Sequence, residues 1–373
     1  MKKLLFLPIL ALVSLVSCEN KNANALVYNS TENPAVTLEL ETIIESKRPW
    51  SMTFLSDDTM LVTEIDGKLL LVKNGTKTEI DGLPEIEVRG QGGLLDIEAH
   101  PNYSENGWIY FTYATSEGDS NDGANTAVMR AKIENNTLVK KEQLYRGTPN
   151  EKSGNHFGSR LAFDKNNFLY FSIGDRFNRD VNPQDITKDG GKIYRLNDDG
   201  SIPESNPFHN EPNAKKAIFT FGNRNPQGMA LNPETGEIWT HEHGPKGGDE
   251  INIMQAGKNY GWPKASYGIN YNGTTLTEHT SLPGMEDPIH YWVPSIAPSG
   301  MEFVTSERYP SLKGNLLVGS LKFQYLNHCH LENNKVVKEE KLFENIGRVR
   351  SVKQSPDGFI YLAVEGKGIL KIK

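Results

Sequence analysis

Several short polar phrases in the sequence contain side chains that could do chemistry, and one of them centres on a histidine. His156 lies in the phrase at residues 154–160, and Asp175 follows across a predicted hairpin at residues 173–176. A histidine with an ordinary pKa near 6.5 can act as a general base at neutral pH, and a carboxylate at the end of the neighbouring strand could orient it. His156 and Asp175 are therefore a candidate catalytic pair, although an isolated histidine is more often structural.

Two further phrases are rich in planar donors or in glycine. One contains Arg224, Asn225 and Gln227, whose donors suit carboxylates and carbonyl groups; a structural turn is the alternative. The other, residues 89–95, contains Gln91 between glycines that let the backbone approach a ligand closely. It has no P-loop lysine and no strand-to-helix context, so a phosphate loop is a weak interpretation and a flexible turn is the alternative.

Another phrase combines histidines with oxygen-rich side chains. His241 and His243 are two residues apart, so they would share one face of a strand and could indicate zinc. No third ligand at a suitable spacing is evident. The stretch with Asp249 and Glu250 fits a hard cation such as calcium better, and a solvated acidic loop is the alternative.

Three basic side chains near the C-terminus could converge on an anionic ligand. They are Lys322, Arg348 and Arg350, and the two arginines would point the same way on a strand. In a chain with a net charge of −7, such a cluster suggests a bound anion. Exposed surface charge is the alternative.

The elements that must position these groups form a sixfold repeat. Each copy has an alternating apolar strand, a turn rich in Asp, Asn or Gly and a second strand, and the copies span residues 51–64, 95–113, 161–174, 229–241, 301–320 and 352–363. A lone hairpin cannot bury its faces, so the copies must pack on one another. The pattern predicts an all-β protein, a six-bladed β-propeller of four-stranded antiparallel blades, with a pair of β-sandwiches as the alternative. The last strand, residues 368–373, would close the ring beside the N-terminal segment.

The N-terminus resembles a bacterial lipoprotein signal. Two lysines precede an apolar run, residues 4–16, that is too short to span a bilayer. Small residues then stand before Cys18, which would become the lipidated first residue; ordinary signal cleavage is the alternative. We expect an exported protein, lipid-anchored at the periplasmic face or outer membrane. Its expected segments are a signal peptide at 1–17, a polar tether at 18–36 and the propeller at 37–373.

Composition limits the possible partners. Basic residues are mixed with acidic ones, so nothing suggests nucleic-acid binding. No second apolar run is long enough to cross a membrane, which leaves the lipid anchor as the expected membrane contact. Cys329 is the other cysteine. We expect it to be a small buried side chain, with a reactive or metal-bound role as the alternative.

In their order along the chain, the phrases resemble those of the soluble sugar dehydrogenases that depend on pyrroloquinoline quinone (PQQ). The resemblance is greatest to the aldose sugar dehydrogenase branch of the glucose/sorbosone dehydrogenase family and extends from about residue 45 to 373. It implies a propeller with PQQ on its axis and calcium, which oxidises an aldose at C1 to the lactone. The hydride would pass to C5 of the quinone, and an external acceptor would reoxidise the cofactor.

The resemblance also implies roles for individual residues. His156 would be the general base, supported by Asp175. The cofactor-binding set would be Gln91, Arg224, Asn225, Gln227, Lys322, Arg348, Arg350 and Ser295, the last in place of a threonine. The carbonyls of Gly244 and Pro245 would bind the calcium that also holds PQQ, and Glu250 and Tyr260 would belong to a second, structural calcium site. Asn155 replaces an aspartate, which puts tight glucose recognition in doubt.

Two other functions are compatible with a propeller. A calcium-dependent hydrolase, such as a lactonase, would need a carboxylate-rich metal site on the axis and would have no use for the cationic set. A binding module is the other alternative, because some animal signalling proteins resemble this family but serve as binding surfaces. Such a protein would be expected to have lost the phrases around His156 or Arg224, and both are present. The shorter loops suggest a monomer.

Overall fold

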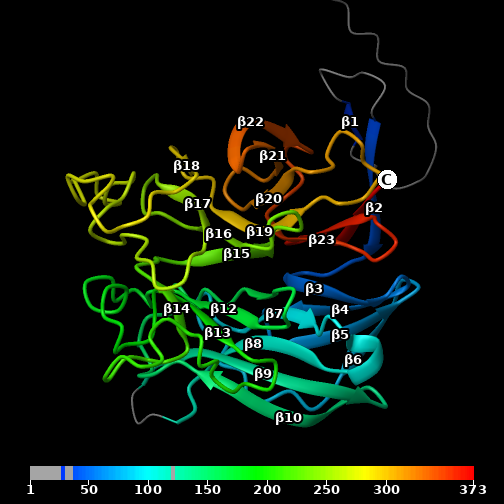
Figure 1. Cartoon of the computed structure of the whole chain (residues 1–373). Coiled ribbons are helices and arrows are strands. Elements are labelled where there is room, and N and C mark those ends of the chain that lie inside the picture. Colours follow the sequence, from blue (N-terminus) through cyan, green and yellow to red (C-terminus); the bar gives the residue numbers. More distant parts are fainter. Residues whose placement is uncertain (1–26, 30–36, 119–121) are drawn as a thin grey trace, which may run out of the picture.

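Nearly all regular structure in the computed structural model is β-strand. The structure describes residues 27–29, 37–118 and 122–373, so the expected signal peptide and Cys18 lie outside the described residues. The strands form six antiparallel sheets, which Figure 1 shows arranged in a ring. The predicted six-bladed β-propeller is confirmed.

The first five blades each consist of four strands that are consecutive in the chain. Blade one contains β3 (Pro49–Ser56), β4 (Thr59–Glu64), β5 (Lys68–Lys73) and β6 (Thr76–Ile80). Blade two contains β7 (Leu94–Ala99), β8 (Ile109–Thr115), β9 (Asn125–Glu134) and β10 (Thr137–Arg146), with the short helix α1 (Tyr103–Asn106) after β7. Blade three contains β11 (Leu161–Phe163), β12 (Leu169–Ile173), β13 (Lys192–Leu196) and β14 (Ile218–Phe221). Blade four contains β15 (Pro226–Leu231), β16 (Ile238–Glu242), β17 (Asp249–Ile253) and β18 (His290–Trp292). Blade five contains β19 (Pro298–Phe303), β20 (Leu316–Ser320), β21 (Leu326–Glu332) and β22 (Lys335–Leu342).

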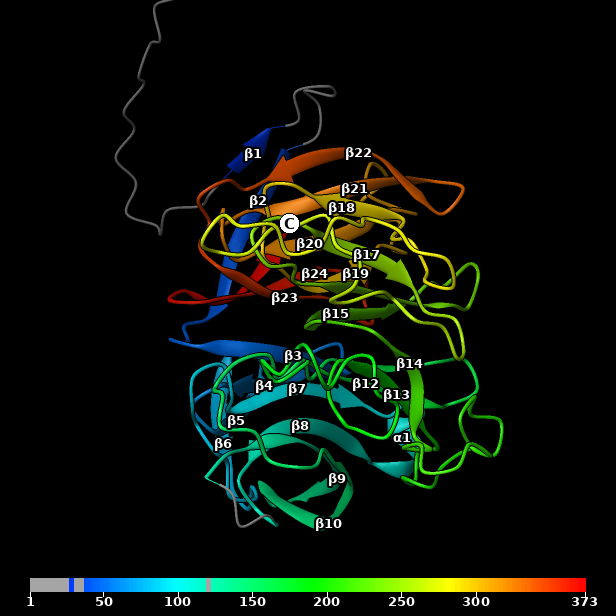
Figure 2. The same cartoon turned by 90° about the vertical axis from the view of Figure 1, so that its left-hand side faces the viewer.

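The sixth blade joins the two ends of the described chain. It contains β23 (Val349–Gln354), β24 (Ile360–Val364), β25 (Gly368–Ile372), β2 (Thr37–Ile44) and β1 (Val27–Asn29). Leu40 of β2 lies opposite Ile372 of β25 in an antiparallel pair, so the expected closure by the last strand is confirmed. Three residues of the expected tether thus form β1, which lies beside β22 of blade five in both views (Figures 1 and 2).

The six repeated hairpins of the sequence are the first two strands of the six blades. The second strands β8, β12, β16, β20 and β24 are buried at every residue, because each blade packs against neighbours through both of its faces. The outer strands β6 and β22 are mostly exposed. In blades one and five, burial therefore decreases from the second strand to the outer strand.

Strand direction brings the polar phrases to one end of the propeller axis. In an antiparallel blade, the connection before the first strand and the connection after the second strand lie at the same end. Gln91, His156 and Arg224 precede the first strands of blades two, three and four, whereas Asp175 and Pro245 follow the second strands of blades three and four. The residues therefore gather at one face.

One buried arginine links all six blades on the axis. Arg160 directly precedes β11 of blade three, and its side chain is 4% exposed. Its guanidinium lies within hydrogen-bonding distance of the other five blades, through Ser51 Oγ, Asp96 Oδ1, the carbonyl of Gln227, Ser299 Oγ and the carbonyl of Arg350. It also lies 4.1 Å from the ring centroid of Trp50.

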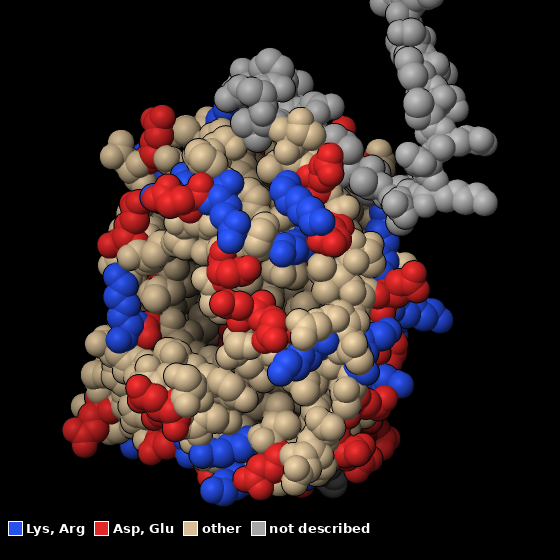
Figure 3. All heavy atoms as spheres, turned by 90° about the vertical axis from the view of Figure 1, so that its right-hand side faces the viewer, with Lys and Arg blue, Asp and Glu red and all other residues tan. Residues whose placement is uncertain are grey.

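The described surface carries charges of both signs. On the face shown in Figure 3, Lys and Arg side chains lie among Asp and Glu side chains. Within the described ranges, no helix has the length and apolar character that crossing a membrane would require.

Candidate active site

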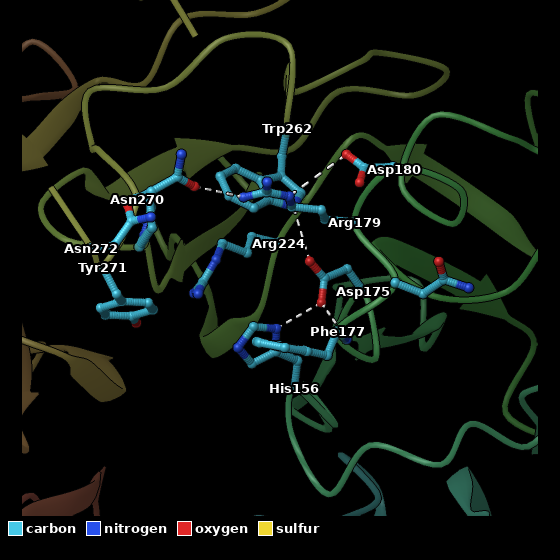
Figure 4. A pocket seen from close by; sticks show the side chains of 12 residues that line it. His156, Asp175, Phe177, Arg179, Asp180, Arg224, Trp262, Asn270, Tyr271 and Asn272 are labelled. Atoms are coloured by element: carbon cyan, nitrogen blue, oxygen red, sulfur yellow. Dashed lines mark hydrogen bonds and ion pairs between the residues drawn. The ribbon is translucent and has the colours of Figure 1, made fainter. Parts of the chain in front are cut away.

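A histidine and an aspartate form a close pair in the connections of blade three. Nδ1 of His156 lies 2.6 Å from Oδ1 of Asp175. The indole of Trp262 donates to the other carboxylate oxygen at 2.9 Å, and the backbone N–H of Phe177 donates to Oδ1 at 2.8 Å. With one ring nitrogen held in this way, Nε2 of His156 points away from Asp175 and into the open space (Figure 4).

The electrostatics of the pair favour a neutral imidazole beside a charged carboxylate. Burial lowers the pKa of His156, the nearby charge of Arg224 lowers it further, and the hydrogen bond to Asp175 opposes both effects. Burial alone would raise the pKa of Asp175, but the hydrogen bond from His156 and the charge of Arg224 bring it below its ordinary value. A neutral histidine with one fixed nitrogen is the form that a general base requires.

The backbone that carries His156 is held in a strained conformation by three predicted site residues. His156 has a φ of +57°, which is costly for a residue other than glycine and is common at functional sites. Gln91 accepts the His156 N–H at 2.8 Å, Asn225 Oδ1 accepts the N–H of Gly158 at 3.0 Å, and Gln227 donates to the Gly158 carbonyl at 2.9 Å. These amides therefore position the base.

Close backbone contact explains one glycine in the Asp175 phrase. A Cβ at Gly174 would lie 2.3 Å from the carbonyl oxygen of His156 and 2.7 Å from Oδ1 of Asn225. Any side chain at this position would push the histidine connection away from Asp175.

The His156–Asp175 pair lines one of two adjoining cavities. The first, about 540 Å³, is lined by His156, Asp175, Arg224, Pro245, Trp262 and by residues of two long connections that include Phe177 and Tyr271. The second, about 390 Å³, is lined among others by Trp50, Gln91, Phe157, Gln227, Arg348 and Arg350. They are neighbours because consecutive residues, His156 and Phe157, line one each.

Arg224 and two exposed aromatic rings shape the first cavity. Arg224 is buried, and its guanidinium donates to the carbonyl of His243 at 2.9 Å and lies 5.2 Å from the ring centroid of Trp262. Phe177 is 61% and Tyr271 68% exposed at the mouth. Figure 4 shows Arg224, Tyr271 and His156 around the same space.

The predicted cationic cluster is only partly assembled. Arg348 and Arg350 share the carboxylate of Glu365, with Nε of Arg348 2.8 Å from one oxygen. Two guanidiniums facing one carboxylate leave a net positive charge at the second cavity. Lys322 lines neither cavity; it is exposed on a neighbouring connection, with its Nζ 4.9 Å from the ring centroid of Phe323.

A tight turn after β16 presents the carbonyls of Gly244 and Pro245. Asp249 accepts the N–H of Gly244 at 2.8 Å, and the Ser295 hydroxyl accepts the N–H of Gly247 at 3.1 Å. Ser295 thus holds this turn in shape. Among the described residues, the Gly244 carbonyl accepts no hydrogen bond and the Pro245 carbonyl accepts only a long one of 3.5 Å from Ser295, so both oxygens have capacity for a cation.

Glu250 lies in a cluster of acidic side chains. It lies directly opposite Glu242 in the β16–β17 pair. Burial and the charge of Glu242 raise the pKa of Glu250 well above its ordinary value, and burial raises that of Glu242 to about 7. The neighbouring Oδ1 of Asn252 is buried without a partner among the described residues. The Tyr260 hydroxyl bonds the backbone at Ile253 and Gln255, which leaves its carbonyl as the group available to an ion.

The two histidines that could have indicated zinc face another blade. A ring nitrogen of His241 lies 3.2 Å from the carbonyl of Gly300, and one of His243 lies 2.8 Å from the carbonyl of Pro298. Both partners belong to β19, so these rings connect blades four and five. Cys329 is fully buried, as expected.

Three residues that face the site had no predicted role. Trp262 and Glu365 are described above, and Glu242 accepts hydrogen bonds from the backbone N–H of Arg224 and, at 3.0 Å, from the side chain of Asn223. Glu242 is the last residue of the second strand of blade four, and Glu365 directly follows the second strand of blade six. Asp175 lies near the end of the second strand of blade three, so this location is a signal that could have found them. Trp262 lies in a long irregular connection, and no local pattern distinguishes it.

Comparison with known proteins gives a consistent result. Residues 46–371 match the model of the family described as glucose/sorbosone dehydrogenase. The aldose sugar dehydrogenase YliI of Escherichia coli K12 is 38% identical over 323 residues, which cover 85% of this chain and 87% of that protein. A crystal structure of glucose dehydrogenase is 37% identical with a TM-score of 0.85, covering 90% of this chain and 98% of that one. The PQQ-bound form of aldose sugar dehydrogenase from Streptomyces coelicolor has the same fold at 24% identity, with a TM-score of 0.75 and coverage of 90% and 98%.

Proposed function

The chain belongs to the glucose/sorbosone dehydrogenase family, and on that basis we propose that it oxidises aldose sugars at C1 to the lactone with PQQ and calcium as cofactors. The electrons would pass to an external acceptor. The observation that carries this proposal is the His156–Asp175 pair, held at 2.6 Å in the wall of one cavity. A second cavity lined by amides and guanidiniums adjoins it.

The second cavity has the chemistry that a planar, multiply charged anion requires. Gln91 and Gln227 contribute planar amides, and Arg348 and Arg350 contribute more positive charge than Glu365 offsets. The Streptomyces coelicolor protein of the same fold is described with PQQ bound. When bound, PQQ supplies the acceptor for the hydride that leaves C1, and calcium supplies a Lewis acid beside it.

His156 provides the proton acceptor of the reaction. Its Nδ1 proton is donated to Asp175, so the lone pair of Nε2 is available in the first cavity. The C1 hydroxyl of the sugar gives its proton to Nε2, and the carboxylate of Asp175 stabilises the imidazolium that forms. The exposed rings of Phe177 and Tyr271 offer flat apolar surface for a sugar at the entrance.

The two predicted calcium sites have donors that suit the ion. Backbone carbonyls and carboxylates are hard oxygen ligands. The Gly244 and Pro245 carbonyls would hold the ion next to the cofactor. Glu250, the Oδ1 of Asn252, which has no partner in the described part of the chain, and the carbonyl of Tyr260 would hold the structural ion.

Reconstitution tests the cofactor assignment directly. Protein treated with a chelator is mixed with glucose and an artificial electron dye, with PQQ, with calcium, with both and with neither. Activity that requires both additions is expected. If PQQ neither binds nor gives activity with any aldose, the assignment is wrong, and a hydrolase or a binding scaffold becomes the better interpretation.

The pH profile of the reconstituted enzyme should report His156. Because burial and Arg224 lower its pKa, kcat/KM should stay constant on the alkaline side and fall only below pH 6.5, where the imidazole protonates. In Asp175→Asn the interaction that raises this pKa is lost, so the acid limb should move to still lower pH. An acid limb with a midpoint above pH 7 in the wild type would contradict this assignment.

Replacement of Glu250 by glutamine should show how calcium binding and like-charge repulsion each affect the Tm. In chelator, Glu250→Gln should melt at a higher temperature than the wild type, because Glu242 then lacks a repelling neighbour. Calcium should raise the Tm of the wild type by more than that of the variant, in which only the site at the Gly244 and Pro245 carbonyls is left. Glu278→Gln, an exposed carboxylate on the adjoining connection, is the matched control and should behave like the wild type. Equal stabilisation of Glu250→Gln by calcium would rule out Glu250 as a ligand.

A further inference from the structure

A second group of ionisable side chains lies far from the cavities, on the outer strands of blade five. His328 and His330 are two residues apart on β21, so both side chains lie on one face of the sheet. Glu340 of β22 is directly opposite His328. The residues are thus brought together by strand register, across a hairpin.

The spacing of these groups is close to that of metal ligands. Oε2 of Glu340 lies 3.7 Å from Nδ1 of His328 and 3.7 Å from Nε2 of His330. One ligand atom from each residue can be chosen so that all lie within 4.8 Å of one another. Tetrahedral zinc with bonds near 2.0–2.1 Å places its ligand atoms about 3.4 Å apart, so small side-chain rotations are sufficient.

The buried histidine supplies a second, independent observation. The His328 side chain is 2% exposed, and neither of its ring nitrogens has a hydrogen-bond partner among the described residues. Nε2 of His330 is likewise buried without a partner there. Buried polar atoms in native proteins are normally paired, and leaving one unpaired is costly. These nitrogens therefore indicate a missing partner that accepts their lone pairs, as a metal ion does.

The surroundings favour a cation that prefers nitrogen. Tyr28 of β1 donates to Oε1 of Glu340, which leaves Oε2 for the shared site. Lys338 of β22 lies directly opposite His330 of β21. Imidazole is a ligand for zinc, copper and nickel, whereas calcium and magnesium take oxygen ligands.

We propose that His328, His330 and Glu340 bind a divalent transition-metal ion, zinc foremost, at the seam between blade five and strand β1. His330 is 27% and Glu340 20% exposed, so water can complete the coordination from the solvent side. Since Glu340 also contacts Tyr28, the ion would fix the N-terminal strand to the rim of blade five. The site is separate from the cofactor cavities and does not depend on the proposed dehydrogenase activity.

Zinc binding to the full chain tests this inference without an activity assay. Chelator-treated protein in excess calcium is titrated with Zn²⁺ by isothermal titration calorimetry, so that oxygen sites are already filled. One zinc per chain is expected, together with a higher Tm in zinc. His330→Ala and Glu340→Gln should each weaken binding by at least about tenfold, since even changes to outer partners of a metal site cost about 10–100-fold.

Two further variants make the result decisive. His330→Cys supplies a thiolate and should restore zinc binding relative to His330→Ala, whereas His279→Ala, an exposed histidine on another blade, should leave it unchanged. His328 itself is not substituted, because loss of a buried ring could unfold the blade; the Tm without zinc shows that each variant is folded. Absence of zinc binding by the wild type, or unchanged affinity in His330→Ala and Glu340→Gln, would overturn the proposal.

Discussion

Replacement of His156 by asparagine should reduce the PQQ-dependent kcat by about 10²–10⁴-fold, the usual contribution of a general base. Asparagine is chosen because it tolerates the left-handed backbone found at this position. The variant therefore loses the base without adding strain. Cofactor affinity, measured by PQQ titration, should change much less than kcat, because the groups that line the second cavity are unaltered.

The matched control is His279→Ala, in which an exposed histidine outside both cavities is removed. Its kcat should equal that of the wild type. His156→Ala should lose activity to a similar degree and also be less stable, because alanine is poorly suited to a positive φ. If His156→Asn retains more than about a tenth of the wild-type kcat, another group is the base, since a general base contributes at least about 10²-fold.

Replacement of Arg160 by methionine should destabilise the whole propeller by about 3–5 kcal/mol. The side chain is buried on the axis and lies within reach of all five other blades. Its loss leaves the buried carboxylate of Asp96 without its charged partner, and breaking a buried ion pair in this way typically costs about this amount. Guanidinium unfolding followed by fluorescence measures the effect.

A double variant separates the lost charge pair from lost packing. Asp96→Asn combined with Arg160→Met removes both charges, so its free energy of unfolding should fall by less than the sum for the two single variants. Lys313→Met removes an exposed cation that pairs with Glu307 at the surface and should cost little, because such pairs contribute about 0–1 kcal/mol. A loss below about 1 kcal/mol in Arg160→Met would show that the axis does not depend on this residue.

The histidine and its carboxylate could be predicted as a pair because both follow from strand order. His156 precedes the first strand of blade three and Asp175 follows the second, so the hairpin between them returns the chain to the same face. The same argument from strand order places Gln91, Arg224 and Pro245 at that face. The partners from other segments could not be predicted, because Trp262 reaches Asp175 from a long irregular connection in blade four.

The arginine cluster shows the limit of reasoning from side-chain spacing. Arg348 directly precedes β23 and Arg350 lies within it, and both line the second cavity. Their shared partner Glu365 lies beyond the next strand. Lys322, predicted as a third cation, is instead exposed on the connection after β20. Sequence spacing carries no information on the distance between separate connections.

The number of blades and the closure of the ring could be predicted from the sequence, because they depend on local hairpins and strand direction. The contacts of each side chain could not be predicted, because they depend on how separate segments pack in three dimensions. His241 and His243 show the same two-residue spacing as His328 and His330. The first pair contacts backbone carbonyls of β19, whereas the second faces Glu340 and has unpaired nitrogens among the described residues. A two-residue period specifies only which side chains share a face, and the chemistry of that face depends on the segment packed opposite it.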